Sequence, residues 1–131
     1  MNANELRIGN YVYFPFTKEV VKILGINAHE INGKIENSIS FMNGLNLYCE
    51  KIEKLKAIDL TDEWLEKLGF KFTKVCHELN GMSMLFYDGW NLNYDKGHDD
   101  YSAIGFWDVH DFQNLYFALT GKELVVSNAV S

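Results

Sequence analysis

The chain has 131 residues, of which 47% are hydrophobic and 23% are charged, and this globular composition excludes an intrinsically disordered protein. The formal net charge is −6, and the second half carries all of it: residues 1–60 contain seven Lys or Arg and seven Asp or Glu, whereas residues 61–131 contain five Lys and eleven Asp or Glu. Nucleic acids are bound largely through Lys and Arg, so the acidic half is a poor candidate for a surface that binds DNA or RNA.

The start of the chain is polar, and no apolar stretch approaches the ~20 residues that a membrane-spanning helix needs. We therefore expect no signal peptide, no membrane association and a cytoplasmic location. The two cysteines, Cys49 and Cys76, lack the CxxC spacing of a metal or redox site and are expected to be free thiols.

Residues 1–58 are expected to form short β-strands. Residues 7–14 and 19–26 are rich in β-branched and aromatic side chains, which favour strands. The dipeptides Asn32-Gly33 and Asn43-Gly44 lie between short alternating segments, and Asn-Gly favours the positive φ angles of a tight hairpin turn. Four or five strands in this length predict a small closed or half-closed barrel, the N-terminal β-barrel-like part of an α+β fold.

Residues 59–126 are expected to form a helix, an antiparallel β-meander and a second helix. Thr61 is a good N-cap for the first helix, and Gly69 is a good stop. Alternating segments separated by Asn-Gly and Asp-Gly turns then predict the meander, whose clearest strand is 90–94.

The second helix is predicted over Val109–Thr120, with Asp108 as its N-cap and Gly121 as its stop. Residues 127–131 are expected to form a frayed tail. No flexible linker separates the two parts of the chain, so we expect 59–126 to pack on 1–58.

Three segments stand in a familiar order: NELRIGNYV at residues 4–12, LTDEWL at 60–65 and QNLYFALTGKEL at 113–124. In this order and at about these distances they resemble a family of small uncharacterised proteins encoded in prophages and mobile elements of gut anaerobes. The last segment is the most specific. The family has no known activity, cofactor or catalytic residue, so the resemblance implies only a setting, that of a cytoplasmic accessory protein of a phage or mobile element.

Six Asp residues between positions 88 and 111 form the densest acidic region. Hard cations prefer several carboxylate ligands, but the spacing fails the calcium-loop pattern, which needs oxygen ligands at every second position and a closing Glu. The alternative is a solvated loop beside a helix whose first turn favours acidic side chains. We favour the solvated loop and predict no metal. Neither GxGxxG nor GxxxxGK[ST] occurs, so a nucleotide-dependent enzyme is disfavoured, and we predict no cofactor.

An enzyme is the second hypothesis, a small metal-dependent or hydrolytic one. His98, Asp99 and Asp100, with His110, could supply a general base, although no serine of the chain lies in a GxSxG turn. A third and weaker hypothesis is nucleic-acid binding through the N-terminal part, with Arg7, Lys18, Lys22 and Lys34.

The leading hypothesis is a non-enzymatic interaction module. Residues 81–117 contain ten of the chain's 19 aromatic side chains, and Trp90, Leu92 and Tyr94 share one face of a strand. An exposed aromatic surface bordered by carboxylates is typical of a protein-interaction patch, whereas the alternative is a thick aromatic core. The predicted patch, for a partner protein or a second copy of the chain, is Trp90, Tyr94, Asp95, His98, Asp99, Asp100 and Tyr101.

Overall fold

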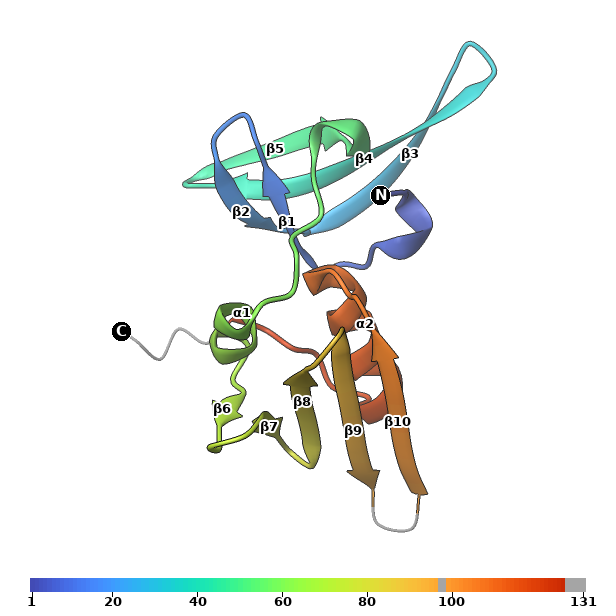
Figure 1. Cartoon of the computed structure of the whole chain (residues 1–131). Helices are drawn as coiled ribbons and strands as arrows, with labels where there is room; N and C mark the ends of the chain where they lie inside the picture. Colours follow the sequence, from blue (N-terminus) through green and yellow to red (C-terminus); the bar gives the residue numbers. More distant parts are fainter. Residues whose placement is uncertain (97–98, 127–131) are drawn as a thin grey trace. The chain divides into compact units, whose positions relative to one another are not determined.

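The computed structural model describes residues 1–96 and 99–126 (Figure 1). The chain is a mixed α/β protein, and the strand pairings of the described residues are antiparallel. In chain order the elements are η1 (Ala3–Glu5), β1 (Tyr11–Phe14), β2 (Glu19–Lys22), β3 (Gly25–Ile31), β4 (Lys34–Asn43), β5 (Asn46–Lys51), η2 (Ile52–Lys54), α1 (Asp62–Lys67), β6 (Lys71–Phe72), β7 (His77–Leu79), β8 (Met82–Phe86), β9 (Trp90–Lys96), β10 (Asp99–Gly105) and α2 (Val109–Thr120). Within the described ranges, no helix combines the length and the apolar character needed to cross a membrane.

The described residues form two compact units. The first unit comprises Met1–Asp59 and Asp108–Glu123, and the second comprises Leu60–Trp107 with residues 124–126. Helix α2 therefore belongs with the N-terminal strands, whereas the sequence analysis groups it with the meander.

The strands of the first unit form a two-stranded hairpin, β1–β2, and a three-stranded sheet in the order β3–β4–β5. The predicted Asn32-Gly33 turn is confirmed, because both residues have positive φ angles, 52° and 78°, and join β3 to β4. Of the predicted closed or half-closed barrel, the closed form is not found among the residues described. Only Ile23 and Leu24 separate β2 from β3, and there the chain passes from one sheet into the other instead of pairing the two strands.

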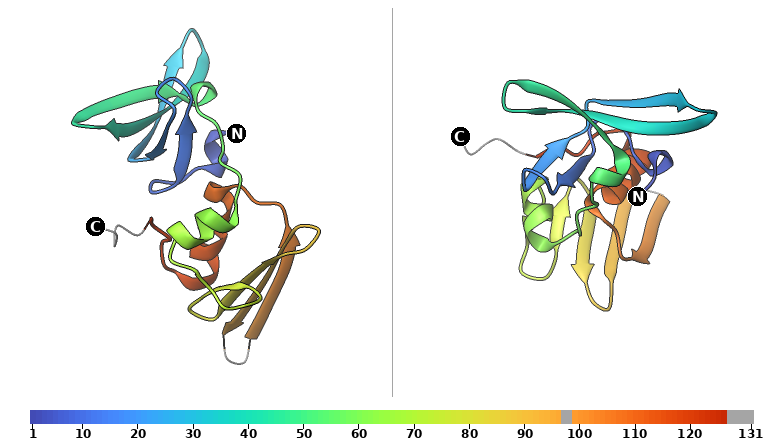
Figure 2. Two further views of the ribbon diagram at one scale, coloured as in Figure 1. Left: turned by 60° about the vertical axis from the view of Figure 1, so that its left-hand side comes forward. Right: turned by 90° about the horizontal axis from the view of Figure 1, so that it is seen from above.

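One hydrophobic core joins the two sheets of the first unit. The hairpin β1–β2 lies against the three-stranded sheet (Figure 2), and the rings of Phe14 and Phe41 meet edge to face with centroids 5.2 Å apart. The buried members of the core are Leu6, Val12, Phe14, Val21, Ile23, Ile39, Phe41, Ile52 and Leu55. Burial of so many aliphatic and aromatic side chains is the main force that holds these strands together.

Helix α1 of the second unit begins and ends as its sequence predicts. The Thr61 hydroxyl accepts a hydrogen bond of 3.2 Å from the Trp64 backbone N–H and so caps the first turn. Gly69 has a φ of 102°, a left-handed conformation that ends a helix, and the Phe70 N–H then donates to the Leu65 carbonyl at 3.0 Å.

The rest of the second unit is the predicted meander, a five-stranded sheet in the order β10–β9–β8–β7–β6. One face of β8 and β9 is buried, and it carries Met82, Met84, Trp90 and Leu92. The Trp90 indole N–H donates a hydrogen bond of 3.2 Å to the Leu60 carbonyl, which satisfies its polar group inside the core.

Helix α2 also has the predicted limits. It starts after Asp108 and stops at Gly121, whose φ is 74°. The predicted cap differs in one respect: Asp108 occupies the N-cap position, but its side chain makes no capping hydrogen bond.

Candidate functional site

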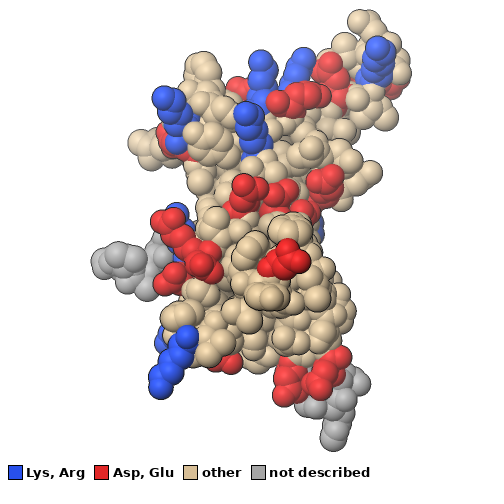
Figure 3. Space-filling model, viewed as in Figure 1, with Lys and Arg blue, Asp and Glu red and all other residues tan. Residues whose placement is uncertain are grey.

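The acidic segment emphasised by the sequence is the β9–β10 hairpin of the second unit. In its register Asp95 stands directly opposite Asp100, and Asn93 stands opposite Ser102. Because residues two apart on a strand share a face, these four side chains lie on one side of the hairpin. The Ser102 hydroxyl donates a hydrogen bond of 2.8 Å to Asn93 Oδ1. Figure 3 shows acidic side chains gathered at the end of this hairpin.

These side chains border a shallow hollow of about 250 Å³. Its lining residues are Asn93, Tyr94, Asp95, Asp100, Tyr101 and Ser102. Four of them, the two tyrosines and the two aspartates, belong to the interaction patch that the sequence predicts. Asn93 and Ser102 were missed, although the alternation of 90–94 places Asn93 on the face opposite the aromatics.

The other predicted patch residues do not line the hollow. Trp90 is only 4% exposed, which corrects the expectation that it forms part of an accessible surface. Asp99 lies in β10, but its side chain is outside the described part, and His98 lies outside the described residues altogether. Two of the three residues on which the enzyme hypothesis rests, His98 and Asp99, therefore have side chains outside the described part.

Apart from Tyr101, the second unit also exposes aromatic side chains that lie outside the predicted patch. Phe86 and Phe106 are 54% and 77% exposed, with ring centroids 6.2 Å apart, and Tyr87 follows Phe86. They lie where β8 turns into β9 and where β10 ends, whereas Asp95 and Asp100 lie at the other end of the same hairpin. The aromatic and acidic surfaces are therefore separate.

A second polar group, in the first unit, surrounds His110. Its Nε2 atom lies 3.4 Å from Glu5 Oε2 and 3.3 Å from Asp111 Oδ1, and the imidazole is fully buried. Burial raises the pKa of the nearby Asp108 carboxyl, the negative charge of Asp111 raises it further, and His110 opposes this; Asp59 and Glu5 add smaller increases.

Glu5, His110 and Asp111 could each offer one ligand atom to a metal ion. The other imidazole nitrogen, Nδ1 of His110, is buried and has no hydrogen-bond partner. A histidine that binds a metal through Nε2 carries its proton on Nδ1 and usually donates it to a carbonyl or carboxylate. The buried Nδ1 atom has no such acceptor, so the arrangement gives no support to a metal site.

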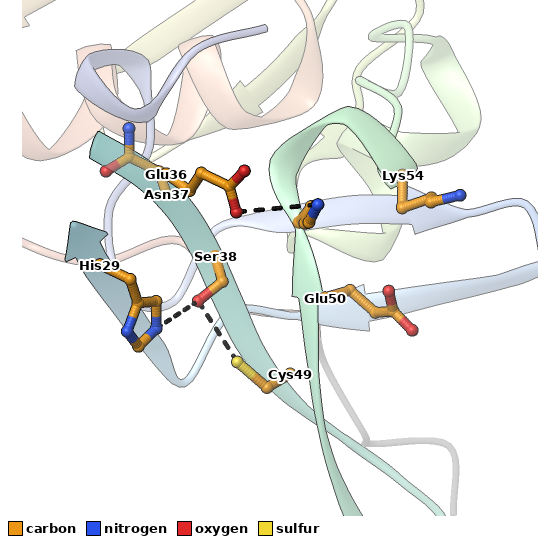
Figure 4. A pocket seen from close by; sticks show the side chains of 8 residues that line it. His29, Glu36, Asn37, Ser38, Cys49, Glu50 and Lys54 are labelled. Atoms are coloured by element: carbon orange, nitrogen blue, oxygen red, sulfur yellow. Dashed lines mark hydrogen bonds and ion pairs between the residues drawn. The ribbon is translucent and has the colours of Figure 1, made fainter. Parts of the chain in front are cut away.

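A cavity of about 370 Å³ lies on the polar face of the β3–β4–β5 sheet in the first unit (Figure 4). Ser38 is buried at its centre, where its Oγ atom lies 3.4 Å from His29 Nε2 and 3.3 Å from Cys49 Sγ. The lining residues are His29, Glu36, Asn37, Ser38, Cys49, Glu50, Lys51 and Lys54. The sequence analysis missed this group, because only the registers of two successive hairpins bring its members together.

Comparison of the chain with protein-family models, with curated proteins and with solved structures finds no match to any of them. The resemblance to proteins of prophages and mobile elements therefore stays a prediction.

Proposed function

We propose that the protein is a non-enzymatic interaction module that binds a basic segment of a partner protein through the acidic face of the β9–β10 hairpin. The observation that carries this proposal is the pairing of Asp95 with Asp100 across the two strands, at the edge of a hollow. A role as a cytoplasmic accessory protein of a phage or mobile element is part of the same proposal and rests on the sequence resemblance alone.

The register sets two carboxylates, Asp95 and Asp100, directly opposite each other. Like charges directly opposite each other on neighbouring strands are destabilising, whereas opposite charges contribute roughly 0.2–1 kcal/mol. A Lys or Arg side chain placed between Asp95 and Asp100 would turn this repulsion into two charge-assisted hydrogen bonds. A basic partner would therefore reduce the repulsion between the two carboxylates.

The neighbouring groups suit a basic side chain as well. Asn93 and Ser102 add neutral hydrogen-bonding groups beside the carboxylates, and Tyr94 and Tyr101 add part of the lining. Tyr94 and Tyr101 stand opposite each other in the register, and the alternation of the strands directs their rings to the other face of the hairpin. The acidic charge disfavours nucleic acid as the partner of this face.

The experiment measures binding of a short fluorescent Arg- and Lys-rich peptide by anisotropy. The double variant D95N/D100N should bind at least about tenfold more weakly than the wild type, a loss of ~1.4 kcal/mol, and added salt should weaken the wild-type complex. The matched control E19Q/E30Q changes the net charge equally but lies in the first unit, and it should bind as the wild type does.

Three results would contradict the proposal. The first is no binding of the basic peptide, and the second is an equal loss in both double variants, which would make the effect one of net charge. The third is self-association in sedimentation velocity that disappears in D95N/D100N, because it would make a second copy the occupant of the hairpin.

A further inference from the structure

The polar face of the β3–β4–β5 sheet contains a nucleophile, a hydroxyl and a base in one line. In the registers of the two hairpins, Cys49 stands opposite Ser40, Ser38 opposite Asn27, and His29 opposite Glu36. Ser38 is thus a diagonal neighbour of both Cys49 and His29, and all three side chains point to the same face. The line crosses three strands, from β5 through β4 to β3.

The hydrogen bonds give this line a direction. The Cys49 thiol donates to Ser38 Oγ at 3.3 Å, so the single hydroxyl proton of Ser38 is free to point toward His29 Nε2 at 3.4 Å. His29 Nε2 accepts a hydrogen bond from the Ser38 hydroxyl when the imidazole carries its proton on Nδ1. Ser38 is 7% exposed and has neighbours on both strands, so it is held in place. The three side chains thus form a hydrogen-bonded line from the sulfur to the imidazole.

The sulfur is open to a reagent, because Cys49 is exposed while its relay partner Ser38 is buried. The cavity around it carries both signs of charge. Lys51 lies 3.7 Å from Glu36, and Lys54 and Glu50 complete the charged lining. A zwitterionic peptide with an amino group and carboxylates is complementary to such a lining.

We infer that Cys49 is a site of reversible thiolation by a low-molecular-weight disulfide of the glutathione type. The Cys49 proton passes to Ser38 Oγ while the Ser38 proton passes to His29 Nε2, and Sγ attacks one sulfur of the disulfide. The Sγ–S bond forms as the disulfide bond breaks, and the leaving thiolate takes up the proton from the imidazolium. The products are a mixed disulfide on Cys49 and one free thiol, so the small disulfide is the oxidant.

The second cysteine of the chain, Cys76, is an internal control for the reactivity of Cys49. Cys76 is half-buried in the second unit, and its sulfur lies 3.8 Å from Thr73 Oγ1. The variant C76S therefore reports on Cys49 alone, and C49S reports on Cys76 alone. Both retain one cysteine, so their rates of reaction are directly comparable.

The experiment follows thiolation by glutathione disulfide with intact-protein mass spectrometry at several pH values. Cys49 should react at least about tenfold faster than Cys76, and H29N or S38A in the C76S background should remove most of that difference, because a positioned general base is worth about two orders of magnitude or more. His29 is exposed, so H29N retains the fold even if S38A does not. Circular dichroism checks both variants.

The charged lining gives a second readout. K51Q/K54Q in the C76S background should slow the reaction with glutathione disulfide but leave the rate with a neutral disulfide, such as hydroxyethyl disulfide, unchanged. Equal rates for Cys49 and Cys76, or a Cys49 rate and pH profile that H29N leaves unaltered, would overturn the assignment. If K51Q/K54Q slowed the reactions with both disulfides equally, the charged lining would not recognise the charges of glutathione disulfide, and the proposed type of reagent would be wrong.

Discussion

The side-chain amide of Gln113 in helix α2 binds two backbone groups on either side of Asn10. Its Oε1 atom accepts a hydrogen bond of 2.9 Å from the Tyr11 N–H, and its Nε2 atom donates one of 3.0 Å to the Gly9 carbonyl. The next residue, Asn114, accepts from Asn10 Nδ2 at 2.9 Å. Segments 4–12 and 113–124, which are far apart in the sequence, are therefore in direct contact inside the first unit.

Replacement of Gln113 by alanine should strongly destabilise the first unit. Gln113 is fully buried, so Q113A leaves a buried N–H and a buried C=O without these partners, and each such group costs about 1–3 kcal/mol. We expect a loss of about 2–5 kcal/mol in the free energy of unfolding, measured with urea. The control N46A removes an exposed amide of the same unit and should change stability by less than about 0.5 kcal/mol. Similar values for the two variants would show that the Gln113 contacts are unimportant.

Short-range chemistry made part of the fold predictable. Thr61, Gly69 and Gly121 are recognisable because a helix cap depends on residues within one turn. Asn32-Gly33 is recognisable because its turn needs positive φ angles. The Gln113 contact joins residues 102 positions apart, and no local pattern contains it.

The candidate sites were predictable only in part, for a related reason. The period of two in 90–94 shows which side chains share a face, but not which face is covered, so Trp90 was expected on a surface and lies in the core. The relay needs contacts over nine residues from His29 to Ser38 and over 11 from Ser38 to Cys49. Each contact depends on a hairpin register, and an error of one residue in either would move a side chain to the opposite face.

Removal of one carboxylate from the β9–β10 pair should stabilise the second unit. D95N and D100N each relieve a direct repulsion across the strands, so we expect a gain of about 0.2–1 kcal/mol at low salt that declines as salt is added. Thermal unfolding at two salt concentrations measures it.

Glu78 is the control for the effect on the second unit, because it is exposed on β7 of the same sheet and stands opposite Lys71. E78Q removes an attraction and should shift the melting temperature in the opposite direction. A decrease in stability for D95N and D100N would mean that the two aspartates do not repel each other.

Asp108 should make the first unit less stable as the pH rises. Its pKa lies above the usual 3.8 in the folded chain, chiefly through burial and then through the charge of Asp111. The folded state holds this proton more tightly than the unfolded state, so the stabilising contribution is present below pH 3.8 and is lost as the pH rises through the raised value. D108N keeps a good N-cap residue and removes the charge. It should therefore raise the melting temperature at pH 7 relative to the wild type and lose that advantage near pH 3.5, and an equal shift at both pH values would contradict this.

Two aromatic residues of the second unit should respond very differently to replacement. Trp90 is 4% exposed and donates to the Leu60 carbonyl, so W90A creates a cavity and also leaves a carbonyl without this donor; we expect a loss of about 3–5 kcal/mol in the free energy of unfolding. W90F keeps a ring but not the N–H and should cost about 1–3 kcal/mol. Phe106 is 77% exposed, and F106A should cost less than about 1 kcal/mol. Denaturant unfolding compares the three variants. A small effect of W90A on the free energy of unfolding would mean that Trp90 is accessible rather than buried. A large effect of F106A would mean that Phe106 is packed rather than exposed.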